Sequence, residues 1–334
     1  MKKEGLISVV SAVLFSIFLS IFSSCSQDTL NLYSIIPDEE TQALCDMFTE
    51  QTGIPVRFLR ASTGELVNRV ISEKNNPKAD ILLGGARNYH IQADKEGALE
   101  SYYSPNAANV PEYALSDDGT WTGFCVLTLA IGINNERFTK LYGDSSKPQT
   151  WEDLLNPSYK GELVFTNPVA SSTGYLFLQN QLQRLGWDKG WDYLVKLADN
   201  VAQFPDSGSS PAKFLGSGEY ALGISYVHLL SRYRANGFNL DVIVPPESVA
   251  DVDCIAIMKN TKKLEQAKKF VDFMLSPEAQ TLMCSIDYTL PVNPDAKIPE
   301  ASIPLSELKL FNYDIQVAAS QKDQVLGEWA KKVK

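Results

Sequence analysis

Short apolar runs alternate with amphipathic segments along the chain, and this alternation predicts strands and helices in turn. Apolar runs at 30–36, 54–59 and 80–83 are typical of buried strands. Between them, residues 41–51 and 66–74 place apolar side chains at helical spacing. Strands that alternate with helices are typical of a parallel sheet, so the pattern predicts an α/β fold.

The same pattern continues through the rest of the chain. An apolar run within 121–134 predicts a long strand that leaves the first half of the fold. The runs at 240–244 and 255–258 predict strands that return the chain to that half. From residue 303 to 334 the spacing predicts mostly helix.

Three of the predicted strand-to-helix turns are rich in small hydroxyl residues, at 60–65, 167–175 and 205–210. Free backbone N–H groups and the positive end of the dipole make a helix N-terminus favourable for an anion, and hydroxyls add donors. A single turn of this kind is an ordinary N-cap. Because such turns lie at the carboxyl ends of strands in open α/β sheets, the threefold recurrence predicts one cleft that holds an oxyanion.

The predicted ligand-binding residues come from these turns and from the ends of other strands. Hydroxyls supply donors, and glycines let the backbone approach a ligand closely. The set is Ser34, Ser62, Thr63, Gly64, Gly85, Ser171, Ser172, Thr173, Ser207, Gly208 and Tyr226.

The N-terminus has the pattern of an export signal. Two lysines precede the apolar stretch 6–22, and two serines lead to Cys25. We interpret 1–24 as a lipoprotein signal peptide, Cys25 as the acylated first residue and 25–29 as a tether. Ordinary signal-peptidase cleavage nearby and an uncleaved anchor are the alternatives. The interpretation places the protein outside the cytoplasm, at the periplasmic or outer face of a membrane.

Composition limits the classes of partner. The chain has 334 residues, 44% of them hydrophobic, which suffices for a large core in two lobes. Its formal net charge of −10 argues against nucleic acid and anionic membrane surfaces as partners. An exported protein can form disulfides, but Cys45, Cys125, Cys254 and Cys284 allow three pairings and equally suit buried free thiols. The pairing stays open.

Several blocks of the chain together resemble the type 2 periplasmic solute-binding proteins of ABC importers. The similar branch is the one grouped with ferric-ion, phosphonate and sugar-phosphate binding proteins. The blocks are 48–65 (FTEQTGIPVRFLRASTGE), 80–100 (DILLGGARNYHIQADKEGALE), 151–175, 218–226, 267–280 (AKKFVDFMLSPEAQ) and 290–293.

The resemblance implies an α/β protein of two lobes, each a mainly parallel sheet flanked by helices, with the ligand cleft between them. Residues 30–125 and 255–300 would form lobe 1, 126–254 lobe 2, and 301–334 a helical segment that packs on a lobe. It further implies hinge closure on the solute, ABC permease and ATPase subunits as partners, and no cofactor. We expect a monomer held at the membrane by the lipid on Cys25.

The resemblance also bears on the solute. The hydroxyl-rich turns are similar to those with which anion-binding relatives hold phosphate or phosphonate, so we expect a small anionic solute. Iron-binding relatives carry adjacent tyrosines after a strand similar to 221–225, whereas here Tyr226 is followed by Val227 and His228. Ferric ion (Fe³⁺), transported as the ligand with Tyr226 in its site, is the alternative.

Two further classes of function are weaker. Ser210 and Lys213 fit the S-x-x-K pattern of serine acyltransferases, but no K-T-G or K-S-G element accompanies them. Neither His90 nor His228 has metal-ligand spacing, and we expect both at the surface or in packing. The sequence therefore predicts a protein that is not an enzyme. A ligand-dependent sensor is a further alternative.

Overall fold

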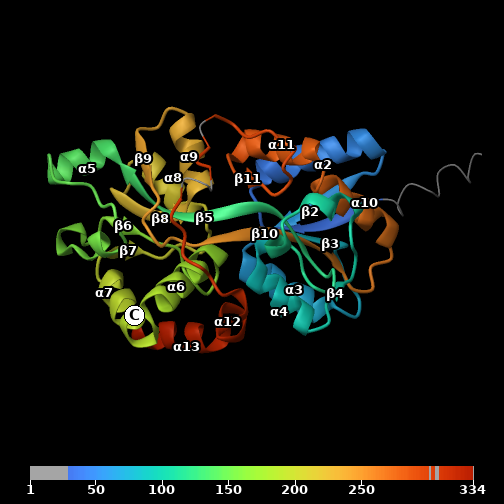
Figure 1. Cartoon of the computed structure of the whole chain (residues 1–334), viewed down its shortest axis with the longest axis horizontal. Coiled ribbons are helices and arrows are strands. Elements are labelled where there is room, and N and C mark those ends of the chain that lie inside the picture. Colours follow the sequence, from blue (N-terminus) through green and yellow to red (C-terminus); the bar gives the residue numbers. More distant parts are fainter. Residues whose placement is uncertain (1–28, 301, 305–307, 334) are drawn as a thin grey trace, which may run out of the picture.

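The computed structural model describes residues 29–300, 302–304 and 308–333, and Figure 1 shows two α/β lobes side by side. A mixed sheet runs through both lobes in the order β2-β1-β3-β10-β5-β8-β6-β7. This confirms the predicted α/β fold, although parallel pairing is confined to the strands away from the centre. The predicted signal peptide and Cys25 lie outside the described residues.

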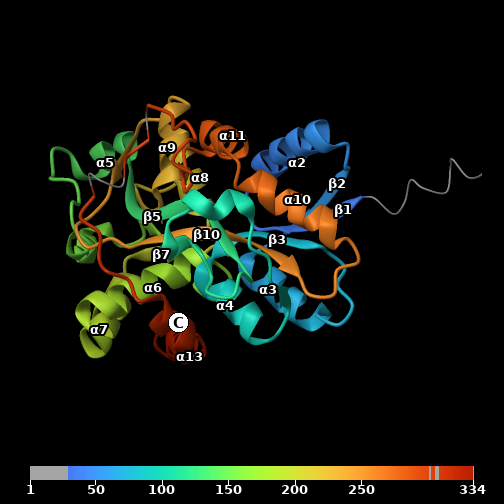
Figure 2. The same cartoon turned by 45° about the vertical axis from the view of Figure 1, so that its right-hand side comes forward.

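Lobe 1 has a parallel core in which β1 pairs with β2 and β3. Its strands are β1 (Leu30–Ser34), β2 (Val56–Arg60), β3 (Ile81–Ala86) and the short β4 (Leu99–Glu100) and β11 (Leu290–Pro291). Its helices are α2 (Asp38–Thr52), α3 (Thr63–Glu73), α4 (Arg87–Lys95), α10 (Leu264–Met274) and α11 (Pro277–Asp287). Figure 2 shows α2 and α10 on one face of this sheet and α3 and α4 on the other.

Helix α2 illustrates how the sequence sets these elements. Three acidic residues occupy its first turn, where they interact favourably with the positive end of the helix dipole. Leu44 and Phe48 are fully buried against the sheet. The helix ends at Gly53, whose φ of 72° is the left-handed conformation that glycine adopts without strain.

Two long strands cross between the lobes. They are β5 (Thr122–Asn134), which is buried along its whole length, and β10 (Ala250–Met258). The first part of β5 pairs antiparallel with β10, and its last part pairs with β8 and β9. The prediction that 240–244 returns the chain to lobe 1 is therefore wrong. That strand stays in lobe 2, and the return comes with β10.

Lobe 2 repeats the arrangement, with β6 pairing parallel to both β7 and β8. Its strands are β6 (Leu163–Val164), β7 (Val201–Gln203), β8 (Leu222–Tyr226) and β9 (Leu240–Ile243). Its helices are α5 (Asn135–Tyr142), α6 (Ser172–Leu185), α7 (Trp187–Ala198), α8 (Ser210–Gly216) and α9 (Val227–Ala235). Short 3-10 turns at Pro105–Asn109, Glu112–Ala114, Glu152–Leu155 and Pro157–Tyr159 complete the two lobes.

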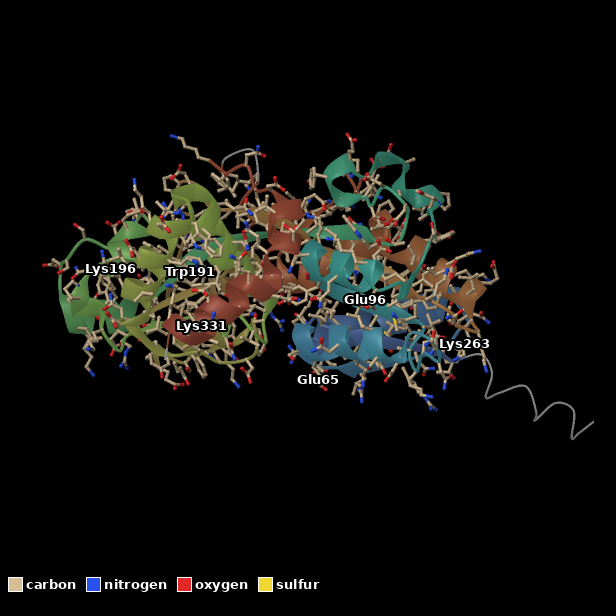
Figure 3. The ribbon with its side chains drawn as sticks, turned by 90° about the horizontal axis from the view of Figure 1, so that it is seen from below. Glu65, Glu96, Trp191, Lys196, Lys263 and Lys331 are labelled. Carbon is tan, nitrogen blue, oxygen red and sulfur yellow. The ribbon has the colours of Figure 1, made fainter. Side chains whose placement is uncertain are left out.

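The C-terminal segment contacts both lobes. It is less helical than predicted, because 308–314 runs extended and bridges Ser248 through Leu310 before α12 (Ile315–Ser320) and α13 (Lys322–Lys332). In α13, Trp329 packs against Phe165 and Phe204 of lobe 2. Figure 3 shows the helix with Lys331 between α7, which carries Trp191, and the lobe with Glu65 and Glu96. Helix α12 packs on α4 of lobe 1.

The state of the cysteines answers the question of pairing that the sequence left open. All four cysteines of the described residues are buried free thiols. In the same part of the chain, no helix combines the length and the apolar character that a membrane span requires.

Candidate functional site

A cavity lies between the lobes, where the ends of β1, β2 and β8 meet the first turns of α3, α6 and α9. Its volume is about 170 Å³. Most of the residues predicted from the sequence line it. These are Ser62, Thr63, Ser171, Ser172, Thr173, Ser207, Gly208 and Tyr226.

Two hydroxyl-rich turns of lobe 2 are packed against each other on one wall of the cavity. A Cβ atom on Gly208 would lie 2.6 Å from Thr173 Oγ1 and 3.1 Å from Ser171 Oγ. Glycine at position 208 is therefore what lets the 205–210 turn approach the start of α6. Thr173 and Ser171 are almost fully buried, so their hydroxyls lie in a site with little water.

The third hydroxyl-rich turn faces these two from lobe 1. Ser62 is at the N-cap position of α3 without a side-chain capping hydrogen bond, and it lines the cavity together with Thr63. Next to them, the Gly64 N–H points at the carbonyl oxygen of Ala170 in lobe 2, 3.5 Å away. A Cβ atom on Gly64 would lie 3.1 Å from the Val169 carbonyl oxygen. Gly64 thus lies in the contact between the lobes and does not line the cavity.

Two other predicted residues lie behind the cavity wall. The Ser34 hydroxyl is fully buried and shares a hydrogen bond of 2.7 Å with the Thr41 hydroxyl. Gly85 is inside β3 with a φ of 88°, and a Cβ atom there would lie 2.9 Å from the Ile35 side chain. Both residues support the wall without being exposed in it.

Arg60 is the residue that the sequence reasoning missed and that matters most for an anion. It ends β2, directly before the hydroxyl-rich turn, and lines the cavity. Its Nε atom is buried and has no hydrogen-bond partner among the described residues. Strand alternation places Arg60 on the same face as the half-buried Val56 and Phe58, and this alternation was the available signal.

Three carboxyl groups line another part of the cavity, and we call Glu40, Asp253 and Asp287 the acidic corner. Burial, and then the neighbouring carboxylates Asp287 and Asp253, raise the pKa of Glu40 well above its ordinary value. Burial, with Asp251 acting in the same direction, raises the pKa of Asp253 to about 7. Burial also raises the pKa of Asp287 to about 7, although Arg232 opposes the shift. No local motif marks these residues, because they come from α2, β10 and α11.

His228 and Tyr226 lie between the acidic corner and the hydroxyl-rich turns. Contrary to the expectation from sequence, His228 lines the cavity, with Nε2 3.2 Å from Asp287 Oδ2. Burial and the charge of Arg232 lower the pKa of His228 to about 3, which favours the neutral imidazole. Its ring stacks on Tyr226, with 5.5 Å between the ring centroids. Burial and the nearby Asp253 raise the Tyr226 pKa well above its ordinary value, so the phenol keeps its proton.

The remaining motifs do not form a reactive site. Lys213 is exposed on α8, and neither it nor Ser210 lines the cavity. His90 is buried, and its Nε2 lies 2.9 Å from the Gly84 carbonyl oxygen, as expected for a packing residue. Within the described residues, no three His, Cys, Asp or Glu side chains are placed so that they could hold a metal ion together.

Known proteins resemble this chain over most of its length. A family model described as bacterial extracellular solute-binding protein matches residues 43–304. An uncharacterized protein of Haemophilus influenzae is 30% identical over 88% of both chains. Iron uptake protein A1 of Synechocystis is 26% identical over 85% of this chain and 81% of the relative.

A solved structure resembles the fold closely. The periplasmic binding protein AfuA from Actinobacillus pleuropneumoniae, determined with exogenous fructose 6-phosphate bound, superposes with a TM-score of 0.89. It is 28% identical, and the alignment covers 92% of this chain and 99% of that one. The family and this neighbour are solute-binding transport proteins and not enzymes.

Proposed function

Because the chain belongs to the bacterial extracellular solute-binding protein family and serves ABC import, we propose that its solute is a small molecule with a phosphate or phosphonate group. The observation that carries the proposal is the convergence of three hydroxyl-rich turns and Arg60 on one cavity. Backbone N–H groups, hydroxyls and a guanidinium are the groups that hold such oxyanions. Fructose 6-phosphate, bound by the related AfuA, is of this class.

The cavity supports a phosphate group better than a ferric ion. A tyrosinate iron site requires several ionised oxygen donors. Tyr226 is the tyrosine that lines this cavity, and its raised pKa favours the neutral phenol. Raised pKa values likewise favour protonated carboxyls in the acidic corner. Ferric ion stays the alternative that the experiment must exclude, because one relative is named as an iron uptake protein.

Capture depends on both lobes. Lobe 1 contributes Arg60, Ser62 and Thr63, and lobe 2 contributes the first turn of α6. A solute bound to one lobe alone would leave the donors of the other unsatisfied, so binding shifts the protein towards the closed arrangement. Closure about β5 and β10 then forms the surface that the permease subunits recognise, with the ATPase subunits on the far side of the membrane.

The remaining assignments are part of the same proposal. Cys25 carries lipid that anchors the monomer to a membrane, and 25–29 is the tether. Lobe 1 comprises 30–125 and 255–300, and lobe 2 comprises 126–254. The segment 301–334 packs against the lobes. The bound solute contacts the eight predicted residues that line the cavity. A sensor that presents the closed lobes to a receptor would use the same cleft.

Native mass spectrometry of protein that starts at Ser26 tests the class of solute. We expect a retained or added organic phosphate or phosphonate whose mass persists after treatment with chelator. An iron mass that chelator removes, in place of any phosphorylated solute, would overturn the proposal.

Calorimetric titration tests the placement of the solute. We expect Ser171→Ala with Ser172→Ala to weaken the affinity for fructose 6-phosphate, or whichever phosphorylated solute the protein retains, about tenfold or more. The matched control is Ser145→Ala with Ser146→Ala, which changes two consecutive serines that are exposed and do not line the cavity. Unchanged affinity in the Ser171→Ala, Ser172→Ala variant would contradict the proposal that the anion binds at the start of α6.

A further inference from the structure

The acidic corner is a property of the cavity that an anion alone does not explain. Glu40 and Asp287 are each 2% exposed, and both line the cavity with the partly buried Asp253. Their carboxyl groups influence one another, as the raised pKa of Glu40 reflects Asp287 first and Asp253 next among its charged neighbours. Arg60 is the one Arg or Lys among the described residues of the lining.

Several polar atoms of the corner have no partner in the described protein. Glu40 Oε2, Asp287 Oδ1 and His228 Nδ1 are all buried without a hydrogen bond. His228 is 7% exposed and lines the cavity from α9 of lobe 2, whereas Glu40 and Asp287 come from α2 and α11 of lobe 1. Buried polar atoms are normally satisfied, so three such atoms at one cavity wall indicate groups that a ligand completes.

The nearest cation does not neutralise the corner. Arg232 on α9 pairs with Glu39, and its Nη1 is 3.8 Å from Asp287 Oδ1, beyond hydrogen-bond distance. Burial raises the pKa values of Glu40 and Asp287, which favours protonated carboxyl groups in the corner. A protonated carboxyl places its own proton where a ligand could present a hydrogen-bond donor.

We propose that the acidic corner binds hydrogen-bond donors, hydroxyl or ammonium groups, carried by the same solute at its end away from the phosphate or phosphonate. This rests on the proposed function, in which the hydroxyl-rich turns and Arg60 hold the anionic end. The corner is then the specificity-determining part of the cavity. Inorganic phosphate leaves it unsatisfied and binds weakly, because a site built to meet donors discriminates against ligands that lack them.

The two kinds of donor have different proton balances. An ammonium group stabilises ionised carboxylates, so its binding releases protons from the corner, whereas neutral hydroxyls release few. The titratable and charged groups around the site of proton release come from six elements. They are Glu40 from α2, Asp253 from β10, Asp287 from α11, His228 and Arg232 from α9, Tyr226 from β8 and Cys125 from β5. Titration near pH 7 in buffers of different ionisation enthalpy counts the protons released.

The experiment compares two matched pairs of probes by calorimetry. 2-Aminoethylphosphonate is compared with ethylphosphonate, and fructose 6-phosphate with propyl phosphate, with inorganic phosphate as the minimal anion. We expect the donor-bearing member of at least one pair to bind about tenfold to hundredfold more tightly than its partner. Preference in the first pair with proton release identifies an ammonium solute, and preference in the second pair without it identifies a hydroxylated solute.

Variants then locate the preference. Glu40→Gln and Asp287→Asn should each reduce the ratio within the preferred pair about tenfold while leaving propyl phosphate or ethylphosphonate binding nearly unchanged. Glu50→Gln, the same change at an exposed position of the same helix, should keep the wild-type ratio. Melting temperatures of the ligand-free variants establish that each folds.

Two results overturn the inference. One is equal affinity within both pairs, and the other is a preference that survives in both acidic-corner variants. In either case phosphorylated probes still bind, so the proposed function stands. If no phosphorylated probe binds and Ser171→Ala with Ser172→Ala has no effect, the proposed function itself fails.

Discussion

Arg60→Gln is the most direct perturbation of the anionic end of the cavity. The substitution removes the guanidinium that lines the cavity and leaves the adjacent turn intact. Arg60 Nε is buried without a partner, so the wild-type protein bears a desolvation cost that a bound oxyanion would offset. Within the described residues, the variant loses no side-chain hydrogen bond from Arg60 Nε, so we expect the loss to fall on solute contacts.

The size of the effect follows from the exposure of the side chain. A hydrogen bond to a charged group contributes about 1.5 to 3 kcal/mol, or about 10- to 150-fold in affinity. Arg60 is only partly buried, so solvent screens its charge and the lower part of the range applies. We expect a loss of about 10- to 30-fold for a phosphorylated solute.

Isothermal titration at low salt measures this loss, with Arg57→Gln as the matched control. Arg57 is on the same strand and is exposed, so the control carries the same change in charge away from the cavity. The free energy of unfolding without solute should change by less than about 0.5 kcal/mol in both variants. An Arg60→Gln affinity within about threefold of wild type, at normal stability, would refute the assignment of Arg60 to the anion.

Three other changes test the packing and electrostatics around the site. Gly174→Ala places a Cβ atom 2.7 Å from the Thr166 carbonyl oxygen, so urea unfolding should show a loss of about 1 to 3 kcal/mol. Trp329→Ala removes a side chain that is 7% exposed, and it should lower the free energy of unfolding by about 3 kcal/mol or more. Trp329→Phe should lower the free energy of unfolding less, because it keeps an aromatic ring. The pKa of Asp253 is raised to about 7 in the folded protein, so its contribution to stability is lost as pH rises from about 4 to 7. In the ligand-free protein, the melting temperature should therefore fall less between about pH 4 and 7 in Asp253→Asn than in wild type. An unchanged pH profile of melting temperature would contradict the raised pKa of Asp253.

The helix boundaries show which features the apolar spacing predicts and which depend on the polar residues of the turns. Apolar spacing located α2 and α3, but these helices begin three residues before the predicted ranges 41–51 and 66–74. Helix α6 starts at Ser172 and α3 at Thr63, because polar residues of the turns already adopt helical conformation there. The position of these hydroxyl-rich turns at helix starts was predictable, since it depends on residues that are adjacent in the chain.

The extended path of 308–314 shows the opposite case. The spacing over 303–334 predicts mostly helix, but the backbone of this stretch pairs with Ser248, and the Glu247 N–H donates to the Lys309 carbonyl oxygen. Pairing with a distant segment decides that conformation, and no local pattern reports it. The pairing of β9 with the last part of β5 is likewise decided by contact with a distant strand, so the expectation that 240–244 returns the chain to lobe 1 was wrong.

The sequence by itself determined the α/β class, the crossing strand β5 and the three hydroxyl-rich turns, because periodicity and helix-capping chemistry act over a few residues. Only the tertiary structure decided what stands opposite those turns. Glu40, Asp253, Asp287 and His228 come from four separate segments and meet because the lobes pack around β5 and β10. Their raised and lowered pKa values arise from burial and mutual charge, which exist only once the chain is folded. The hydroxyl-rich wall of the cleft was therefore predictable from the chain, and the acidic corner was not.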